Sequence, residues 1–225
     1  MAEAIWSLTP DTIVLTEFVP GPSRKGFFAE LASFGLIHRS VSQYTQKQNH
    51  VLIASRYTLN AGAIQAPAIA SALPSNVLHV LQADVGLEIL GLRVPDYSKQ
   101  PHIKRKCWDW IIKTVADFKD RPFVMLGDFN TDPNYSKAKC GDCISKLLAE
   151  GWQHAAPTEG ASFWSPRGHP VRIDHAFVSK HFSIQNARYV DVFDRYVFAG
   201  RGRRALSDHA VLVVDIALVG GQTKQ

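Results

Sequence analysis

Acidic and amide side chains follow a short apolar run in the middle of the chain. Residues 123–126 are typical of a buried strand, and Gly127 is followed by Asp128 and Asn130. Side chains two positions apart on an extended segment point the same way, so Asp128 and Asn130 are expected to project together from the carboxyl end of the strand. Ligands of open α/β sheets bind at that end. The alternative is an Asx-type turn that has no function.

Three other apolar runs are bounded by acidic or histidine side chains. Near the start of the chain, one run ends at Glu17. Near the other end, Asp174 opens a second run, and Asp208 and His209 come directly before a third. Four unrelated turns explain this repetition poorly. We therefore interpret the four segments as parts of one site.

The chain resembles the endonuclease/exonuclease/phosphatase superfamily in four motifs that occur in the same order. They are Pro-Asp-Thr-Ile-Val-Leu-Thr-Glu (10–17), Gly-Asp-Phe-Asn (127–130), Arg-Ile-Asp-His-Ala-Phe-Val-Ser (172–179) and Ser-Asp-His-Ala-Val-Leu-Val-Val (207–214). The superfamily includes exonuclease III, apurinic endonucleases, pancreatic deoxyribonuclease, sphingomyelinases and inositol polyphosphate phosphatases. The resemblance covers the chain from about Pro10 to Ile216. It implies an α/β (α+β) fold, a four-layer sandwich of two packed mixed β-sheets with helices outside.

The resemblance also implies a metal centre and an activated water. Glu17 would bind a divalent metal ion, Mg²⁺ or Mn²⁺, because hard cations prefer carboxylate oxygens. Asp208 would be a further metal ligand or would tune the local charge. Asp128 would orient or deprotonate the attacking water. The alternative for Glu17 is a carboxylate at a sheet edge that faces water.

Contacts with the substrate phosphate are expected for another three residues, one of which is paired with Asp174. Asn130 would donate to a nonbridging oxygen, and His209, paired with Asp174, would donate to the phosphate as charge builds. A carboxylate beside an imidazole fixes its tautomer and favours its protonated form. Arg93 stands where relatives carry Tyr or His, and its guanidinium would clamp phosphate oxygens. The alternatives are a structural ion pair between Asp174 and His209, and an Arg93 that pairs with a surface carboxylate.

Two departures from the family pattern bear on activity and substrate. Relatives begin one strand earlier, with an Asn that also lines the site, and the printed chain has no such segment before Met1. Three explanations are open. The assigned start codon lies downstream of the true start codon, the printed sequence is a fragment of a longer chain, or the protein lacks that strand. Relatives that act on abasic sites carry a Trp where this chain has Val171, which weakens an abasic-site assignment.

Composition favours a soluble protein with polyanionic partners. The chain has 25 Lys and Arg against 20 Asp and Glu, a formal charge of +5 and a pI near 9.2. Nucleic acid is the favoured partner, and the basic stretches 102–106 and 195–204 would contact it or simply face solvent. A small or lipid phosphate ester is the alternative substrate. A noncatalytic domain that binds a phosphate polymer is the third interpretation.

The length of 225 residues predicts a single domain over residues 1–219, with a disordered tail at 220–225. Three cysteines and no apolar signal segment favour the reducing cytoplasm. Cys140 and Cys143 have the spacing of zinc or redox sites, but no second pair completes a tetrahedral set. No apolar run reaches the ~20 residues that cross a bilayer. The sequence does not indicate an oligomeric state.

Several elements are predicted to position the site. A helix is expected at residues 27–34, two paired strands at 77–82 and 87–92, and a helix opening at 102–106 with an apolar stripe that begins at Trp108. A further helix is expected over residues 143–150, with Ile144, Leu147 and Leu148 facing inward. His175 would point to the opposite face of its strand from Asp174, where we interpret it as structural.

Overall fold

In the computed structural model of the protein, the described residues are 1–44, 48–69, 74–96 and 100–220. They fall into two compact units. The first unit comprises Met1–Trp110 and Met125–Asn130, and the second comprises Ile111–Val124 and the chain from Thr131 onward. The single domain expected over residues 1–219 stays a prediction. Of the predicted tail, residues 221–225 lie outside the described residues.

Two β-sheets and the helices beside them make up the described part of the first unit. The sheets have the strand orders β1-β3-β2 and β4-β5-β6-β7. The elements are α1 (Ala2–Trp6), β1 (Thr12–Phe18), α2 (Arg24–Ser33), β2 (His38–Val41), β3 (His50–Ser55), β4 (Leu59–Ala61), the 3-10 helix η1 (Pro74–Asn76), β5 (Val77–Gln82), β6 (Leu87–Arg93), the first part of α3 (Pro101–Val115) and the end of β7 (Phe123–Asp128). The predicted pairing of β5 with β6 is confirmed as an antiparallel ladder.

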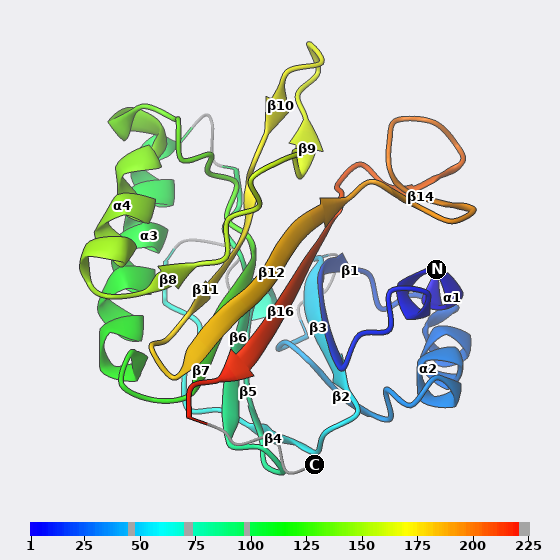
Figure 1. Cartoon of the computed structure of the whole chain (residues 1–225). Helices are drawn as coiled ribbons and strands as arrows, with labels where there is room; N and C mark the ends of the chain where they lie inside the picture. Colours follow the sequence, from blue (N-terminus) through cyan, green and yellow to red (C-terminus); the bar gives the residue numbers. More distant parts are fainter. Residues whose placement is uncertain (45–47, 70–73, 97–99, 221–225) are drawn as a thin grey trace. The chain divides into compact units, whose positions relative to one another are not determined.

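The two sheets of the first unit pack face to face. Their shared core contains Val51 and Ile53 of β3 with Val80 and Ile89 of the other sheet. Gly91 of β6 permits this close approach, because a Cβ there would lie 2.9 Å from side-chain atoms of β1 and β3. On the outer face of the β1-β3-β2 sheet, α1 and α2 cover a second apolar cluster (Figure 1).

Shorter strands and one long ladder make up the described part of the second unit. The long ladder is antiparallel and joins β12 to β16, the gold and red strands of Figure 1. The elements are the end of α3, the 3-10 helices η2 (Ala116–Phe118) and η3 (Lys137–Lys139), the start of β7, α4 (Gly141–Ala149), β8 (Gln153–His154), β9 (Phe163–Trp164), β10 (Pro170–Val171), β11 (Asp174–Val178), β12 (Phe182–Val190), β13 (Val192–Phe193), β14 (Tyr196–Ala199), β15 (Ala205–Ser207) and β16 (Val211–Leu218).

Pairing within the second unit is mixed. β8 pairs with β11, and β9 with β10, both antiparallel. β14 lies between β13, which is antiparallel to it, and β15, which is parallel to it. Strand β14 therefore occupies the first half of the segment 195–204. The sequence analysis treated this segment only as a basic stretch and overlooked the apolar residues between Arg195 and Arg201.

One other sequence prediction of the second unit, the inward-facing Leu148, is changed by the structure. Leu148 of α4 is 43% exposed, because the buried stripe of this helix runs through Cys143, Ile144 and Leu147 and leaves Leu148 at its margin. Cys140 and Cys143 are buried thiols that form no disulfide. No described helix is long and apolar enough to span a membrane.

Candidate functional site

The carboxyl end of β7 carries Asp128, as predicted. Gly127 precedes it with a φ of 144°, and a Cβ at this position would lie 1.9 Å from the carbonyl oxygen of Leu92. Glycine is therefore required for β7 to approach β6 this closely. The main-chain N–H of Val94 donates to the carbonyl of Asp128 at 2.8 Å. This contact fixes the strand end, and Asp128 itself is 3% exposed.

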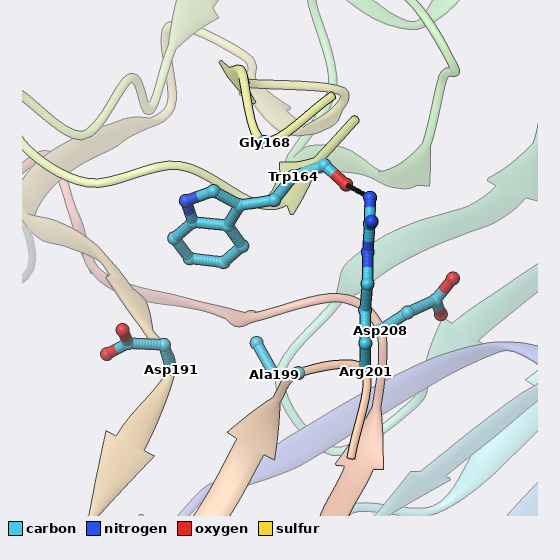
Figure 2. A pocket seen from close by; sticks show the side chains of 7 residues that line it. Trp164, Gly168, Asp191, Ala199, Arg201 and Asp208 are labelled. Atoms are coloured by element: carbon cyan, nitrogen blue, oxygen red, sulfur yellow. Dashed lines mark hydrogen bonds between the residues drawn. The ribbon is translucent and has the colours of Figure 1, made fainter. Parts of the chain in front are cut away.

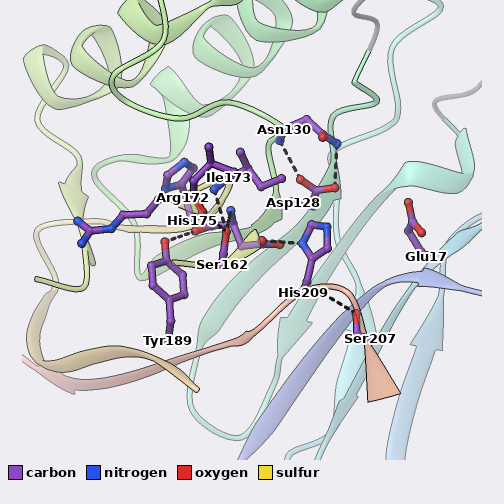
Figure 3. Close-up of polar contacts among 12 residues, drawn as sticks. Glu17, Asp128, Asn130, Ser162, Arg172, Ile173, His175, Tyr189, Ser207 and His209 are labelled. Carbon is purple, nitrogen blue, oxygen red and sulfur yellow. Dashed lines mark hydrogen bonds and ion pairs between the residues drawn. The ribbon is translucent and has the colours of Figure 1, made fainter. Parts of the chain in front are cut away.

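Asn130 is bonded to the carboxylate of Asp128 (Figure 3). Its main-chain N–H donates to Oδ1 of Asp128, and its side-chain Nδ2 donates to Oδ2, each at 2.8 Å. Nδ2 also donates to the carbonyl of Val94 at 2.9 Å. Asn130 has a φ of 49°, a left-handed conformation that Asn tolerates better than most residues. The amide thus fixes the orientation of the buried carboxylate, and its donors face protein oxygens.

Glu17 stands at an irregularity of β1. Thr16 and Glu17 together oppose the single residue Val51 of β3, which is a β-bulge. Glu17 has a φ of 58°, and the side chain is half-exposed. A bulge re-aims the side chain that it carries. The sequence predicted Glu17 at the strand end, but the structure places it one residue before that end, on this bulge.

Arg93, the last residue of β6, contacts both carboxylates of the first unit. Its Nη2 forms an ion pair with Glu17, and its Nε lies 3.6 Å from Oδ2 of Asp128. The Nε atom is buried and has no hydrogen-bond partner among the described residues. Arg93 therefore pairs with a carboxylate, as the alternative interpretation expected, and the partner is the predicted metal ligand. We call Glu17, Arg93, Asp128 and Asn130 the carboxylate group.

Lys104 supports the carboxylate group and was missed by the sequence analysis. It is buried, and its ammonium donates to the main-chain carbonyl of Asn130. One turn later on α3, Trp108 packs against Phe129 with ring centroids 5.2 Å apart. The sequence reading assigned residues 102–106 to solvent or nucleic acid. The i, i+4 spacing of Lys104 and Trp108 is the signal that places Lys104 on the buried stripe instead.

In the second unit, Asp174 contacts His209. Nδ1 of His209 lies 2.8 Å from Oδ2 of Asp174, and both side chains are partly buried. The ring of Phe163 packs against the imidazole with centroids 5.0 Å apart. The Ser207 hydroxyl accepts from the main-chain N–H of His209 at 3.0 Å, which fixes the turn into β16 (Figure 3). The contact between Asp174 and His209 that the sequence predicted is present.

Two neutral side chains hold the main chain at Asp174. The buried hydroxyl of Ser162 accepts from the N–H groups of Ile173 and Asp174, at 2.8 and 3.1 Å. The hydroxyl of Tyr189 donates to the carbonyl of Asp174 at 2.8 Å, and burial raises the pKa of this phenol. We call Ser162, Asp174, Tyr189 and His209 the imidazole group. Sequence reasoning missed Ser162 and Tyr189, because their partners are main-chain atoms distant in the chain.

His175 lies in a buried network beside Asp174. Its Nε2 lies 2.7 Å from the carbonyl oxygen of Thr131, and its Nδ1 lies 3.1 Å from Nε2 of His154. Burial lowers the pKa of His175, and burial together with His175 lowers the pKa of His154 to about 4. Both rings are therefore neutral near pH 7. These contacts fit the structural interpretation of His175.

Asp208 differs from the other acidic residues of the predicted site. It is exposed, although it directly precedes the partly buried His209. It also lines a pocket of the second unit together with Trp164. Its role as a metal ligand stays a prediction.

The residues of the carboxylate group fit a magnesium ion in their chemistry. Mg²⁺ keeps several waters in proteins and binds through one or two carboxylates together with substrate phosphates. Glu17 and Asp128 supply two such carboxylates. No cluster of three or more His, Cys, Asp or Glu side chains that would form a full protein cage occurs among the described residues. Two carboxylates together with a substrate phosphate are nevertheless the kind of ligand set that Mg²⁺ takes in proteins.

A model of the Endonuclease/Exonuclease/phosphatase family matches residues 7–209. The chain therefore belongs to this family. Members of the family are phosphoesterase hydrolases, and the protein is an enzyme of this class. Enzymes of the family generally depend on a divalent metal ion. A search of curated proteins gave no match.

Solved structures share the fold at low sequence identity. An endonuclease/exonuclease/phosphatase from Beutenbergia cavernae is 18% identical with a TM-score of 0.72, and the match covers 96% of this chain and 65% of that one. A 3'-5' exonuclease from Neisseria meningitidis is 19% identical with a TM-score of 0.67, covering 95% and 92%. A mannosyl-6-phosphatase from Bacteroides thetaiotaomicron is 16% identical with a TM-score of 0.63, covering 96% and 89%. The predicted fold class, α/β with mixed sheets and helices, is confirmed.

Proposed function

We propose that the protein is a Mg²⁺-dependent phosphodiester hydrolase that acts on DNA or RNA. The observation that carries the proposal is the imidazole of His209 held at 2.8 Å by the carboxylate of Asp174. An ionised carboxylate only accepts hydrogen bonds, so Nδ1–H of His209 donates to it and the contact sets the tautomer and orientation of the ring. In its protonated form this ring donates to a phosphate oxygen as negative charge builds in the transition state.

The carboxylate group prepares the nucleophile in this proposal. Asp128 orients the attacking water and accepts its proton, and Asn130 keeps that carboxylate in place. Glu17 and Asp128 would hold the metal ion, which neutralises phosphate charge when bound. The guanidinium of Arg93 is only partly buried, and its accessible N–H groups would donate to a nonbridging phosphate oxygen.

Charge within the carboxylate group favours joint binding of metal and substrate. Two carboxylates, Glu17 and Asp128, are partly offset by the guanidinium of Arg93, and the ammonium of Lys104 lies on the neighbouring carbonyl of Asn130. A dication adds charge that the anionic phosphodiester then compensates. We therefore propose that the metal ion binds weakly alone and more tightly with substrate. Both residue groups would act in one reaction, with Asp208 as a further metal ligand.

Nucleic acid is favoured over a small substrate by charge. The chain carries a formal charge of +5, and Arg201, Arg203 and Arg204 are exposed residues next to β15. Likeness in fold to a 3'-5' exonuclease supports the same choice. Likeness to a mannosyl-6-phosphatase keeps a small phosphate ester, or a lipid one, as the second candidate.

Hydrolysis of a substrate panel tests the proposal. Single-stranded DNA, RNA, plasmid DNA, a chromogenic bis-ester and a sugar phosphate are each incubated with Mg²⁺, with Mn²⁺ and with EDTA. We expect metal-dependent cleavage of a polynucleotide at a kcat/KM well above that of the small esters. A preference for the sugar phosphate would move the assignment to a phosphatase. Absence of any metal-dependent turnover would contradict the hydrolase assignment, and a protein that only binds polynucleotides would then remain.

A further inference from the structure

The second unit contains a pocket of about 380 Å³, and of the residues that line it the proposed reaction uses Asp208 alone. One side is the β9–β10 hairpin and its loop, and the other is the end of β14 with the residues that follow (Figure 2). The pocket is lined by Trp164, Gly168, Asp191, Ala199, Gly200, Arg201 and Asp208. We call this pocket the Trp164 slot.

The walls of the slot are flat and small. The indole of Trp164 forms one wall, and the methyl group of Ala199 points toward it (Figure 2). Gly200 has no side chain, so the far wall leaves room for a planar group. The carboxylates of Asp191 and Asp208 point away from the space between the indole and Ala199. The interior therefore offers an aromatic face and few polar partners.

Arg201 fixes the position of the aromatic wall. Its guanidinium donates to the carbonyl oxygens of Trp164 at 3.1 Å and Pro166 at 3.0 Å, and also to that of Ser165. Within the loop, the N–H of Ser165 donates to the carbonyl of His169 at 2.9 Å. These bonds occupy the guanidinium and hold the hairpin in place before a ligand arrives. A preformed wall lowers the entropy that binding costs.

The slot lies next to His209 through β9. Phe163 forms an isolated antiparallel bridge with His209 and packs on its ring. Trp164 is the next residue of the strand, so its side chain points to the opposite side from Phe163. Asp208, which lines the slot, is the chain neighbour of His209. A substrate whose phosphate is held by His209 would have to extend past Asp208 to the other side of β9 to place its next part in the slot.

We propose that the Trp164 slot binds a nucleobase of the substrate by stacking on the indole. The inference rests on the proposed function and narrows its substrate class to nucleotide esters. A nucleobase is flat and stacks on an aromatic side chain whatever its identity. A sugar would need several inward polar partners for its hydroxyl groups, and Arg201 and the two carboxylates do not supply them. The slot would thus add affinity for bases with little sequence preference.

Binding of two strands that differ only in their bases tests the proposal. Fluorescence anisotropy in EDTA compares a labelled single-stranded octathymidylate with an octamer of abasic tetrahydrofuran units that has the same phosphates. We expect the wild type to bind the base-bearing strand about tenfold tighter. Trp164→Ala should remove most of this preference, and Trp164→Phe should keep much of it. Ala199→Leu, which fills the slot and keeps Trp164, should also remove it.

Phe193 supplies the matched control. It is an exposed aromatic residue of β13 in the same unit that does not line the slot, so Phe193→Ala should keep the preference. Equal binding of the two strands by the wild type would overturn the proposal, and so would an unchanged preference in both Trp164→Ala and Ala199→Leu. Hydrolysis of the abasic strand with Mg²⁺ is measured separately. If the protein hydrolyses polynucleotides but binds both strands equally, the proposal for the Trp164 slot is refuted and the proposed hydrolase activity stands. If it prefers the base-bearing strand but hydrolyses nothing, the proposed hydrolase activity is refuted and the proposal for the slot stands.

Discussion

The two residue groups hold their functional side chains by different means. In the carboxylate group, Arg93 neutralises Glu17 and approaches Asp128, and both Glu17 and Asn130 have left-handed backbone. In the imidazole group, Asp174 is fixed through neutral hydrogen bonds from Ser162 and Tyr189, and neither Asp174 nor His209 is among the described residues with a positive φ.

This difference suggests a division of labour. Ion pairs between partly exposed groups exchange partners readily, because water and other ions compete for them. Buried hydrogen bonds to the main chain are costly to break, since each leaves an unsatisfied polar atom. We infer that the carboxylate group is built to take up and release a cation, whereas the imidazole group is built to keep one geometry. The predictions below test this contrast in order of expected effect.

The largest effect is expected from Asp174→Asn. An amide nitrogen facing Nδ1 of His209 disfavours the tautomer and the charge that phosphate binding needs. We expect kcat/KM for a polynucleotide to fall by about 10²–10⁴-fold, with metal affinity unchanged. Steady-state kinetics and calorimetric metal titration measure the two quantities. Asp215→Asn, an exposed carboxylate of β16 in the same unit, is the control and should retain activity.

Removing Arg93, the cation of the carboxylate group, should strengthen metal binding, whereas Asp174→Asn should leave it unchanged. Arg93→Gln frees Glu17 from its ion pair and leaves Asp128 with one less cation nearby. We expect Mg²⁺ or Mn²⁺ to bind at least tenfold tighter in calorimetry, because the guanidinium no longer competes for the carboxylates. Arg56→Gln, which breaks the exposed ion pair with Asp11 in the same unit, should leave metal affinity unchanged. If Arg93→Gln binds the metal ion more weakly than the wild type does, the guanidinium does not compete with the metal ion for the carboxylates.

Ser162→Ala should destabilise the protein without changing metal affinity. The substitution leaves the N–H groups of Ile173 and Asp174 without their buried acceptor, so we expect a loss of about 1–3 kcal/mol in the free energy of unfolding. Urea denaturation measures it. Tyr189→Phe removes a single donor and should cost about 0.5–1.5 kcal/mol. If Ser162→Ala unfolds like the wild type, the hydroxyl does not support the imidazole group.

Acidification should weaken the second unit through its buried histidines. The pKa of His154 is about 4 in the folded protein and 6.5 for the ordinary residue, so between these values the unfolded state binds more protons. Stability therefore falls as the pH drops from 6.5 toward 4. His154→Gln should make this slope shallower in urea titrations between pH 7.5 and 4.5. His169→Gln, an exposed histidine of the same unit, should leave the slope unchanged.

Local pattern predicted the elements better than it predicted the site geometry. The alternation in 77–82 and 87–92 was enough for β5 and β6, because the period of a strand is a local property. The bulge at Glu17 was out of reach, since it depends on how β1 pairs with a strand more than thirty residues later in the chain. The same holds for Arg93, whose identity was noted but whose partner is set by the spatial order of the strands.

The site residues that the sequence analysis identified are acidic, amide or histidine residues at the ends of strands. Asp128 and Asn130 were predicted from motif and spacing, and the contact between Asp174 and His209 was predicted from the resemblance to the family. Ser162 was missed because it bonds to main-chain atoms, which leave no pattern in the sequence. The Trp164 slot was missed because its two sides come from segments about 35 positions apart, and only the fold brings Ala199 opposite the indole.

The most direct test of the account is whether both residue groups serve one reaction. Polynucleotide hydrolysis with Mg²⁺ is measured for Asp128→Asn, His209→Gln and the double variant, with circular dichroism and thermal unfolding as checks on folding. We predict that each single variant loses at least 100-fold in kcat/KM, and that the double variant is little worse than the more damaged single one, because groups that act in one step are not additive. Wild-type kcat/KM in either single variant would contradict the account.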